Sequence, residues 1–344
     1  MQIRQENIKE RGFVMSTKQK IVTANGTIRT SKRKIDASDI QLYTLCLIPL
    51  LTLFLFNYIP MFGVVLAFKD YNYQDGIWGS AWVGFKNFEF FFKSDVFVEL
   101  VRNTLFNNFL FIVAGILSAL TVAILLYELK SRLATKIFQT ILITPHFMSW
   151  VIVAYMVLAI LNTSDGFLNR ILISLGISTA ETAIDWYSKP SAWPIILTIC
   201  SVWHAVGMDS VVYYASLMGI DSSLFEAAEV DGANKWQRII NIVLPSLVPI
   251  IVILTILKIG AIFRADFGLF YNVTMDGASG NLYRTTNVID TYTFRLFSSN
   301  TNSNVGNSYG LATAVSLLQS VVGMILVIST NAASKKIDSE LGLF

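Results

Sequence analysis

The feature that most limits the fold of this chain is a series of long apolar stretches. A helix needs about 20 apolar residues to cross the hydrocarbon core of a bilayer. Six stretches meet that requirement: 42–68, 103–129, 138–161, 193–218, 247–267 and 311–330. We therefore expect an all-α polytopic membrane protein with six transmembrane helices, forming one transmembrane domain over residues 42–330.

The composition agrees with a membrane protein and argues against an enzyme. Of the 344 residues, 54% are hydrophobic and only 14% are charged, whereas soluble domains average about 25% charged residues. The two cysteines, Cys46 and Cys200, lie in apolar stretches and predict neither a disulfide framework nor a metal site. The chain has no P-loop pattern. We expect no catalytic residue, no metal and no cofactor on this chain.

The distribution of basic residues predicts the orientation in the membrane. With the N-terminus inside, the cytoplasmic segments 1–41, 130–137, 219–246 and 331–344 carry sixteen Lys and Arg, against nine in and beside the outer loops. This bias follows the positive-inside rule, so we expect both termini in the cytoplasm. Residues 1–40 hold nine basic and four acidic residues. A nucleic-acid-binding arm is the alternative, but a cytoplasmic membrane flank is favoured, with lipid and no nucleic acid as its partner.

One cytoplasmic segment, residues 221–249, has the pattern of a helix–turn–helix. Ser223 and Glu226 have the spacing of a capping box, which predicts the start of a short helix. Gly232 permits a turn that other residues resist. A second helix is expected from about Ala233 to near Pro245. Such a segment is either a rigid knob on which a partner acts or an elbow that connects two spans.

The same segment resembles the EAA signature of ABC-importer permeases. Every fixed position of EAA-x3-G-x9-I-x-LP is filled, by Glu226, Ala227, Ala228, Gly232, Ile242, Leu244 and Pro245, with Asp231 of the common DGA variant beside them. The resemblance implies that Glu226 meets a basic residue in a cleft of a separate ATPase and that Gly232 makes the turn. It also implies a second permease chain and two ATPase copies, which would bind ATP and Mg.

Other stretches resemble carbohydrate-type permeases related to the maltose system. These are Phe68-Lys-Asp-Tyr71, Trp82-Val-Gly-Phe-Lys-Asn-Phe88, Arg102-Asn-Thr-Leu105 and Thr144-Pro-His-Phe-Met-Ser-Trp150. The last one resembles the subgroup that imports complex oligosaccharides. The resemblance implies a type I importer permease fold in the cytoplasmic membrane of a bacterium, an extracytoplasmic sugar-binding protein and an oligosaccharide substrate. The alternatives are an ABC importer of a non-sugar solute and an ion-coupled secondary carrier that uses Asp209 and Lys258.

Two charged residues are expected inside the membrane, where a charge costs roughly 2.5–3.5 kcal/mol on insertion scales. At 1.5 Å per residue, Lys258 lies about 20 Å from Pro245 and Asp209 about 13 Å from Met218, so the two could meet. They form a structural ion pair, or Lys258 faces a cavity and binds sugar hydroxyls or a uronate carboxylate.

Aromatic and polar residues share helix faces in the middle of the chain. Asp209 and Tyr213, and likewise His146 and Trp150, stand four residues apart, which suits sugar binding or simple helix packing. Residues Trp203 and His204 offer a similar pair. His204 points about 140° away from Asp209 at 100° per residue. For Asn107, Asn108 and Gln319 we favour hydrogen bonds between membrane helices, and for Arg264 a side chain that extends to the interface.

Overall fold

The computed structural model describes residues 18–22, 28–32, 37–129, 131–179, 181–277, 280–298 and 308–337. The chain divides into two compact units, Met1–Phe62 and Gly63–Phe344. Parts of the two predicted cytoplasmic ends, residues 1–41 and 331–344, lie outside the described residues.

The first unit contains a strand pair and a helix. Strand β1 (Lys18–Val22) pairs antiparallel with β2 (Ile28–Lys32). Helix α1 (Ala37–Leu53) continues through the π-helical η1 (Phe54–Tyr58) into α2 (Ile59–Met61). The apolar side chains of residues 41–62 are exposed on all sides of this helix, as expected for a helix surrounded by lipid or by another membrane helix.

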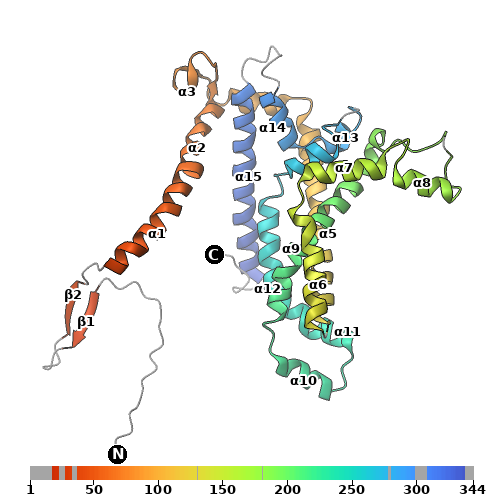
Figure 1. Cartoon of the computed structure of the whole chain (residues 1–344). Helices are drawn as coiled ribbons and strands as arrows, with labels where there is room; N and C mark the ends of the chain where they lie inside the picture. Colours follow the sequence, from red (N-terminus) through yellow and green to blue (C-terminus); the bar gives the residue numbers. More distant parts are fainter. Residues whose placement is uncertain are drawn as a thin grey trace, which may run out of the picture. The chain divides into compact units, whose positions relative to one another are not determined.

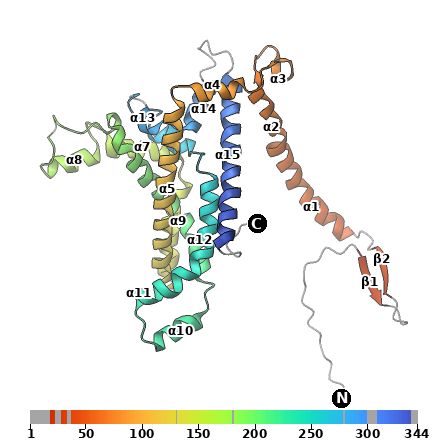
Figure 2. The ribbon, with the colours of Figure 1, turned by 180° about the vertical axis from the view of Figure 1, so that it is seen from behind.

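The second unit is built on five long helices, α5 (Phe97–Tyr127), α6 (Arg132–Ile143), α9 (Trp193–Leu217), α12 (Leu244–Gly260) and α15 (Ser308–Ile337). Helix α9 packs along α5 and α6, and α15 packs along α12 (Figures 1 and 2). Close approach depends on glycine: a Cβ on Gly207 would lie 2.0 Å from the carbonyl oxygen of Leu142, and one on Gly260 would lie 2.1 Å from Val327.

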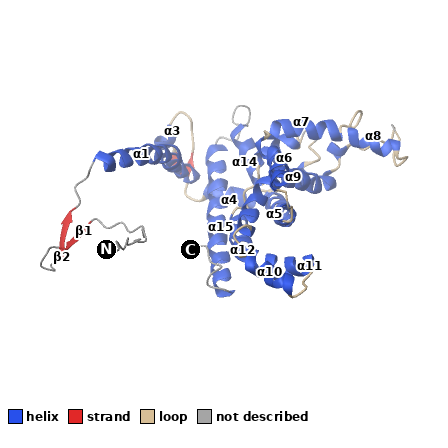
Figure 3. Ribbon diagram, turned by 60° about the horizontal axis from the view of Figure 1, so that its bottom comes forward, coloured by secondary structure: helices blue, strands red, loops and turns tan. Residues whose placement is uncertain are grey.

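The short elements gather at the two ends of this unit. Helices α10 and α11 lie at one end (Figures 1 and 3), and α4, α7, α13 and α14 lie at the other (Figure 2). The short elements are η2 (Phe62–Phe68), β3 (Lys69–Asp70), α3 (Gly76–Gly79), β4 (Ala81–Trp82), α4 (Lys86–Lys93), η3 (Thr144–Phe147), α7 (Trp150–Leu161), α8 (Phe167–Ser174), η4 (Trp186–Ser188), η5 (Pro190–Ala192), α10 (Ser222–Val230), α11 (Lys235–Arg238), η6 (Ile239–Val243), η7 (Leu269–Val273), α13 (Tyr283–Thr286) and α14 (Ile289–Ser298).

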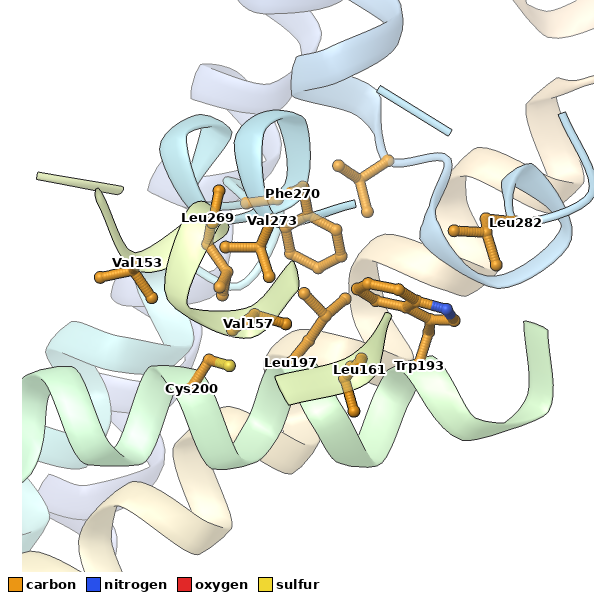
Figure 4. Packing of buried hydrophobic residues seen from close by; sticks show 13 residues of the cluster. Val153, Val157, Leu161, Trp193, Leu197, Cys200, Leu269, Phe270, Val273 and Leu282 are labelled. Atoms are coloured by element: carbon orange, nitrogen blue, oxygen red, sulfur yellow. The ribbon is translucent and has the colours of Figure 1, made fainter. Parts of the chain in front are cut away.

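The largest apolar cluster of the second unit lies at the end opposite α10. Side chains of α7, α9 and η7 meet there, as Figure 4 shows for Val157, Leu197 and Phe270. The indole of Trp193 is fully buried in this cluster and donates a hydrogen bond to the carbonyl oxygen of Trp186 at 2.9 Å. The cluster fixes α7 and η7 on the end of α9.

The third predicted span, 138–161, is bent and is not one continuous helix. Among the described residues, five helices are long and apolar enough to cross a membrane, or six if the pair Arg132–Phe147 and Trp150–Leu161 is counted as one span bent by 98°. Met148 is extended, with ψ of 136°. Ser149 then starts a new helix by accepting a hydrogen bond from the Val151 N–H. The bend follows Pro145, which cannot donate to the preceding turn.

The fifth span also differs from the prediction. Its helix is continuous from Lys235 to Gly260, so Pro245 does not end the second helix of segment 221–249, and the span stops before the predicted residue 267. The π-helical turn η6 precedes Pro245, and the Leu244 N–H reaches back to the carbonyl oxygen of Ile239. Proline is tolerated in the first turn after such an irregularity because its missing N–H needs no partner there.

Candidate translocation cavity and coupling segment

Segment 221–249 folds as the short helix α10 and the first part of the long helix that begins at Lys235, joined by the predicted glycine turn. Gly232 has a φ of +74°, a conformation that glycine adopts without strain. The predicted cap is wrong, because Asp221, and not Ser223, is the N-cap of α10 and accepts a hydrogen bond from the Ser223 N–H at 3.0 Å. A capping box does occur before α11, where Asn234 and Gln237 bond reciprocally.

The signature residues of this segment are largely exposed. Glu226, Ala227, Asp231, Gly232 and Pro245 are exposed, and Ala228, Ile242 and Leu244 are half-buried. Two contacts join the segment to the end of α5. The ring of Phe225 packs on that of Tyr127 with centroids 6.0 Å apart, and Lys235 Nζ lies 3.6 Å from Glu128 Oε2. Sequence reasoning missed Tyr127 and Glu128, because they lie about 100 residues before Phe225 and Lys235 and nothing in the sequence shows that they are close in space.

A cavity of about 190 Å³ opens between α5, α9 and the end of α12. Its lining residues are Asn108, Phe111, Ile112, Gly115, Ser201, Val202, Ala205, Val206, Asp209, Lys258, Ala261, Ile262 and Arg264. Lys258 Nζ lies 2.6 Å from Asp209 Oδ2, and the two side chains keep 34% and 32% of their surface exposed. The two residues therefore do meet, and they do so on the wall of the cavity.

Amide side chains support the backbone where α12 ends beside the cavity. Asn108 Nδ2 donates to the carbonyl oxygens of Ile262 and Arg264 at 2.7 and 3.0 Å. Gln319 Nε2 donates to that of Phe263 at 2.7 Å. The backbone after Gly260 is not helical, so its buried carbonyls need other partners, and these amides supply them. Asn107 Nδ2 likewise reaches the carbonyl oxygen of Thr285, in α13, at 3.1 Å. The structural role predicted for these three amides is confirmed, but their partners are the segment after α12 and the short α13, and not a second membrane helix.

Two charged groups complete this support. Asp290 Oδ2, from α14, accepts from the Ala265 N–H at 2.7 Å and from Gln319 Nε2 at 3.2 Å. Burial raises the pKa of the Asp290 carboxyl, and these two hydrogen bonds oppose the rise. Arg264 lines the cavity and donates to Ser320 Oγ at 3.2 Å. Sequence reasoning missed Asp290, because the sequence does not show that the outer segment 268–310 folds back to the end of α12.

The predicted aromatic candidates gather at the bend of the third span. The Trp150 and His204 rings stack with centroids 4.2 Å apart, and His146 lies 5.4 Å from His204. His204 Nε2 is 3.1 Å from the carbonyl oxygen of Met148, and Trp150 Nε1 donates to Asp266 Oδ2 at 2.9 Å. These contacts hold the bend in place.

None of the five aromatic candidates is among the cavity-lining residues of the described chain. His146, Trp150 and His204 lie at the bend of the third span, outside the cavity lining. Trp203 is exposed. Tyr213 is buried in a cluster with Ala119, Ala123 and Val243. Of the seven predicted cavity residues, Asp209 and Lys258 are the pair that the structure brings to the cavity.

Residues 111–339 match the family described as binding-protein-dependent transport system inner membrane component. The chain belongs to this family. Its members are ABC-importer permeases, so the predicted type I importer permease fold is confirmed. This permease is therefore a transport component.

Relatives and solved structures cover almost the whole permease. It is 34% identical to Protein LplB of Bacillus subtilis (strain 168), over 89% of this chain and 92% of LplB. It is 31% identical to the polygalacturonan/rhamnogalacturonan transport system permease protein YteP of the same organism, over 87% and 89%.

The solved structures are of a bacterial ABC transporter involved in the import of the acidic polysaccharide alginate. One matches with a TM-score of 0.75 and 32% identity, over 88% of this chain and 97% of that chain. A second, in complex with an alginate pentasaccharide-bound periplasmic protein, matches with a TM-score of 0.74 and 32% identity, over 87% and 96%.

Proposed function

We propose that this permease carries an oligosaccharide across the cytoplasmic membrane of a bacterium by alternating access. The observation that carries the proposal is the likeness to the alginate importer permease over 88% of the chain at 32% identity. YteP, a polygalacturonan/rhamnogalacturonan transport permease, supports the same class of solute. The polar cavity between α5, α9 and α12 is the proposed path of the solute through this subunit.

Energy enters the permease through α10. The exposed Glu226 is the proposed contact with a separate ATPase, which binds ATP and Mg. Helix α10 joins a continuous helix of 26 residues, Lys235–Gly260, by the turn at Gly232. That helix is about 39 Å long and carries Lys258 near its far end. Closure of the ATPase would tilt this helix against α9 and change the shape of the cavity.

The partners follow from this mechanism. Each permease chain carries one segment like 221–249 for contact with an ATPase. A second permease and two ATPase copies, one for each such segment, therefore complete the transporter. An extracytoplasmic sugar-binding protein delivers the solute, as the alginate-bound periplasmic protein of the similar transporter suggests. Both termini and α10 face the cytoplasm in this arrangement, in agreement with the distribution of Lys and Arg.

The test compares two charge reversals on α10. Glu226→Lys is expected to leave the protein folded, because the side chain is exposed, and to abolish ATP-driven oligosaccharide uptake by the reconstituted complex. Glu229→Lys, also exposed on the same helix and outside the signature, is the matched control and should retain uptake. Normal uptake by Glu226→Lys would remove α10 as the site where the ATPase acts.

A further inference from the structure

The charges on the cavity wall do not balance. Lys258 and Arg264 line the cavity with one acidic residue, Asp209. At neutral pH this leaves one positive charge without a counterion among the lining residues. Uncompensated charge at membrane depth is costly, and such residues generally mark the path of a substrate or an ion. A ligand that brings a negative charge would remove this cost.

Resting on the proposed function, we propose that the cavity binds the carboxylate of an acidic sugar unit through Lys258 and Arg264. Asp209 is then an internal counterion, which holds Lys258 while the cavity is empty. A cavity of about 190 Å³ is smaller than the roughly 300–1,000 Å³ of pockets that enclose a whole ligand. It therefore suits one charged unit of a longer chain.

Both cations have donors to spare within the described residues. An ammonium has three donors, and the one hydrogen bond recorded for Lys258 goes to Asp209. A guanidinium has five donors, and Arg264 uses one of them on Ser320. A carboxylate is bound well by such a pair, because guanidinium and carboxylate match in geometry and both partners are charged.

The surroundings of Lys258 leave room for this exchange. Helix α5 passes beside Lys258 at Gly115, where an added Cβ would lie 3.9 Å from Lys258 Nζ. About a third of the Lys258 and Asp209 side chains is exposed, so water and solute reach the pair. If a substrate carboxylate takes the place of Asp209 as the partner of Lys258, Lys258 keeps a hydrogen bond to a negative charge. If a neutral sugar hydroxyl takes that place, Lys258 loses its ion pair.

The experiment measures equilibrium binding of two probes to the purified complete complex of permeases and ATPase, without the binding protein. The probes are trigalacturonate and the same trisaccharide with its carboxyl groups reduced to alcohols. We expect the acidic probe to bind about tenfold tighter or more, the gain typical of a hydrogen bond between charged groups. The double variant Asp209→Asn with Lys258→Met should lower this preference, because Arg264 alone remains to bind the carboxylate, and it leaves Asp209 and Lys258 without an unpaired charge.

Two further variants make the result specific. Lys258→Arg keeps a cation and should keep the preference, and Asp209→Asn alone should strengthen acidic binding. Lys335→Met, an exposed lysine near the end of α15, is the control and should change nothing. Equal binding of the two probes by the wild type, or an unchanged preference in the double variant, would overturn the proposal.

Uptake and binding measured together distinguish a failure of the anion site from a failure of the proposed function. If proteoliposomes take up the neutral trisaccharide with ATP and the two probes bind equally, the permease still imports oligosaccharides and the anion site is wrong. If neither sugar binds or is taken up, both proposals fail.

Discussion

Asn108, in the middle of α5, donates a hydrogen bond of 2.7 Å to the carbonyl oxygen of Ile262, two residues past the end of α12. The same amide reaches the carbonyl oxygen of Arg264. One side chain therefore supports the backbone between Lys258 and Arg264, the two cations of the cavity. Irregular backbone at membrane depth is tolerated where other parts of the protein satisfy its polar groups, and Asn108 does so for the segment after α12.

Replacement of Asn108 by leucine is expected to lower the thermal stability of the purified permease in detergent. Bonds between membrane helices contribute about 0.6 kcal/mol on average, so the loss of two predicts a destabilisation of roughly 1 kcal/mol. The control is Thr121→Ala on the same helix, which removes only an exposed bond to the carbonyl oxygen of Leu117. Equal thermal stability of the two variants would show that Asn108 does not stabilise the backbone after the end of α12.

Replacement of Gly207 by alanine is expected to separate α9 from α6. Its Cβ would lie 2.0 Å from the carbonyl oxygen of Leu142, and overpacking of this kind costs about 1–3 kcal/mol. Gly63→Ala is the control, since nothing lies within 4 Å of a Cβ there. Thermal unfolding of both variants checks the prediction, which fails if Gly207→Ala unfolds at the temperature of the control.

The pH dependence of stability should report on Asp290. Burial raises the pKa of this carboxyl in the folded protein above its unfolded value. Its contribution to stability is therefore fully present below the unfolded pKa and is lost as pH rises through the folded pKa. Asp290→Asn removes the charge and keeps an acceptor for the Ala265 N–H. The unfolding temperature of Asp290→Asn, relative to that of the wild type, should therefore increase as pH rises from about 4, the ordinary pKa of Asp, toward neutrality.

Asp290→Ala separates this charge effect from the hydrogen bonds. Alanine leaves the buried Ala265 N–H without its acceptor, which costs about 1–3 kcal/mol at every pH. An Asp290→Asn profile that stays parallel to the wild type from acidic to neutral pH would contradict the assigned pKa shift.

The number and order of the spans could be predicted from the sequence, because a bilayer requires long apolar helices and little else. The bend at Met148 and the early end of α12 at Gly260 could not. Both depend on partners far along the chain, such as His204 for the bend and Asn108 for the end of α12. Hydropathy averages over a window and does not register a carbonyl that is bonded by another helix.

The candidate site was predictable to a similar degree. The glycine turn and the exposed Glu226 follow from local spacing, whereas the cap was assigned to Ser223 because a capping box and an aspartate cap two residues earlier have similar patterns. Asp209 and Lys258 were identified by charge in an apolar context. The aromatic candidates were proposed for the cavity from their spacing along helices, with helix packing as the alternative. That spacing does not register the bend after Pro145, where Trp150 stacks on His204.

The most direct test of the account is the energy source of uptake in proteoliposomes that contain both permeases, the ATPase and the binding protein. Labelled oligosaccharide should enter only when ATP is available to the ATPase, and an imposed proton or sodium gradient without ATP should drive none. Uptake driven by an ion gradient in the absence of ATP would contradict the account.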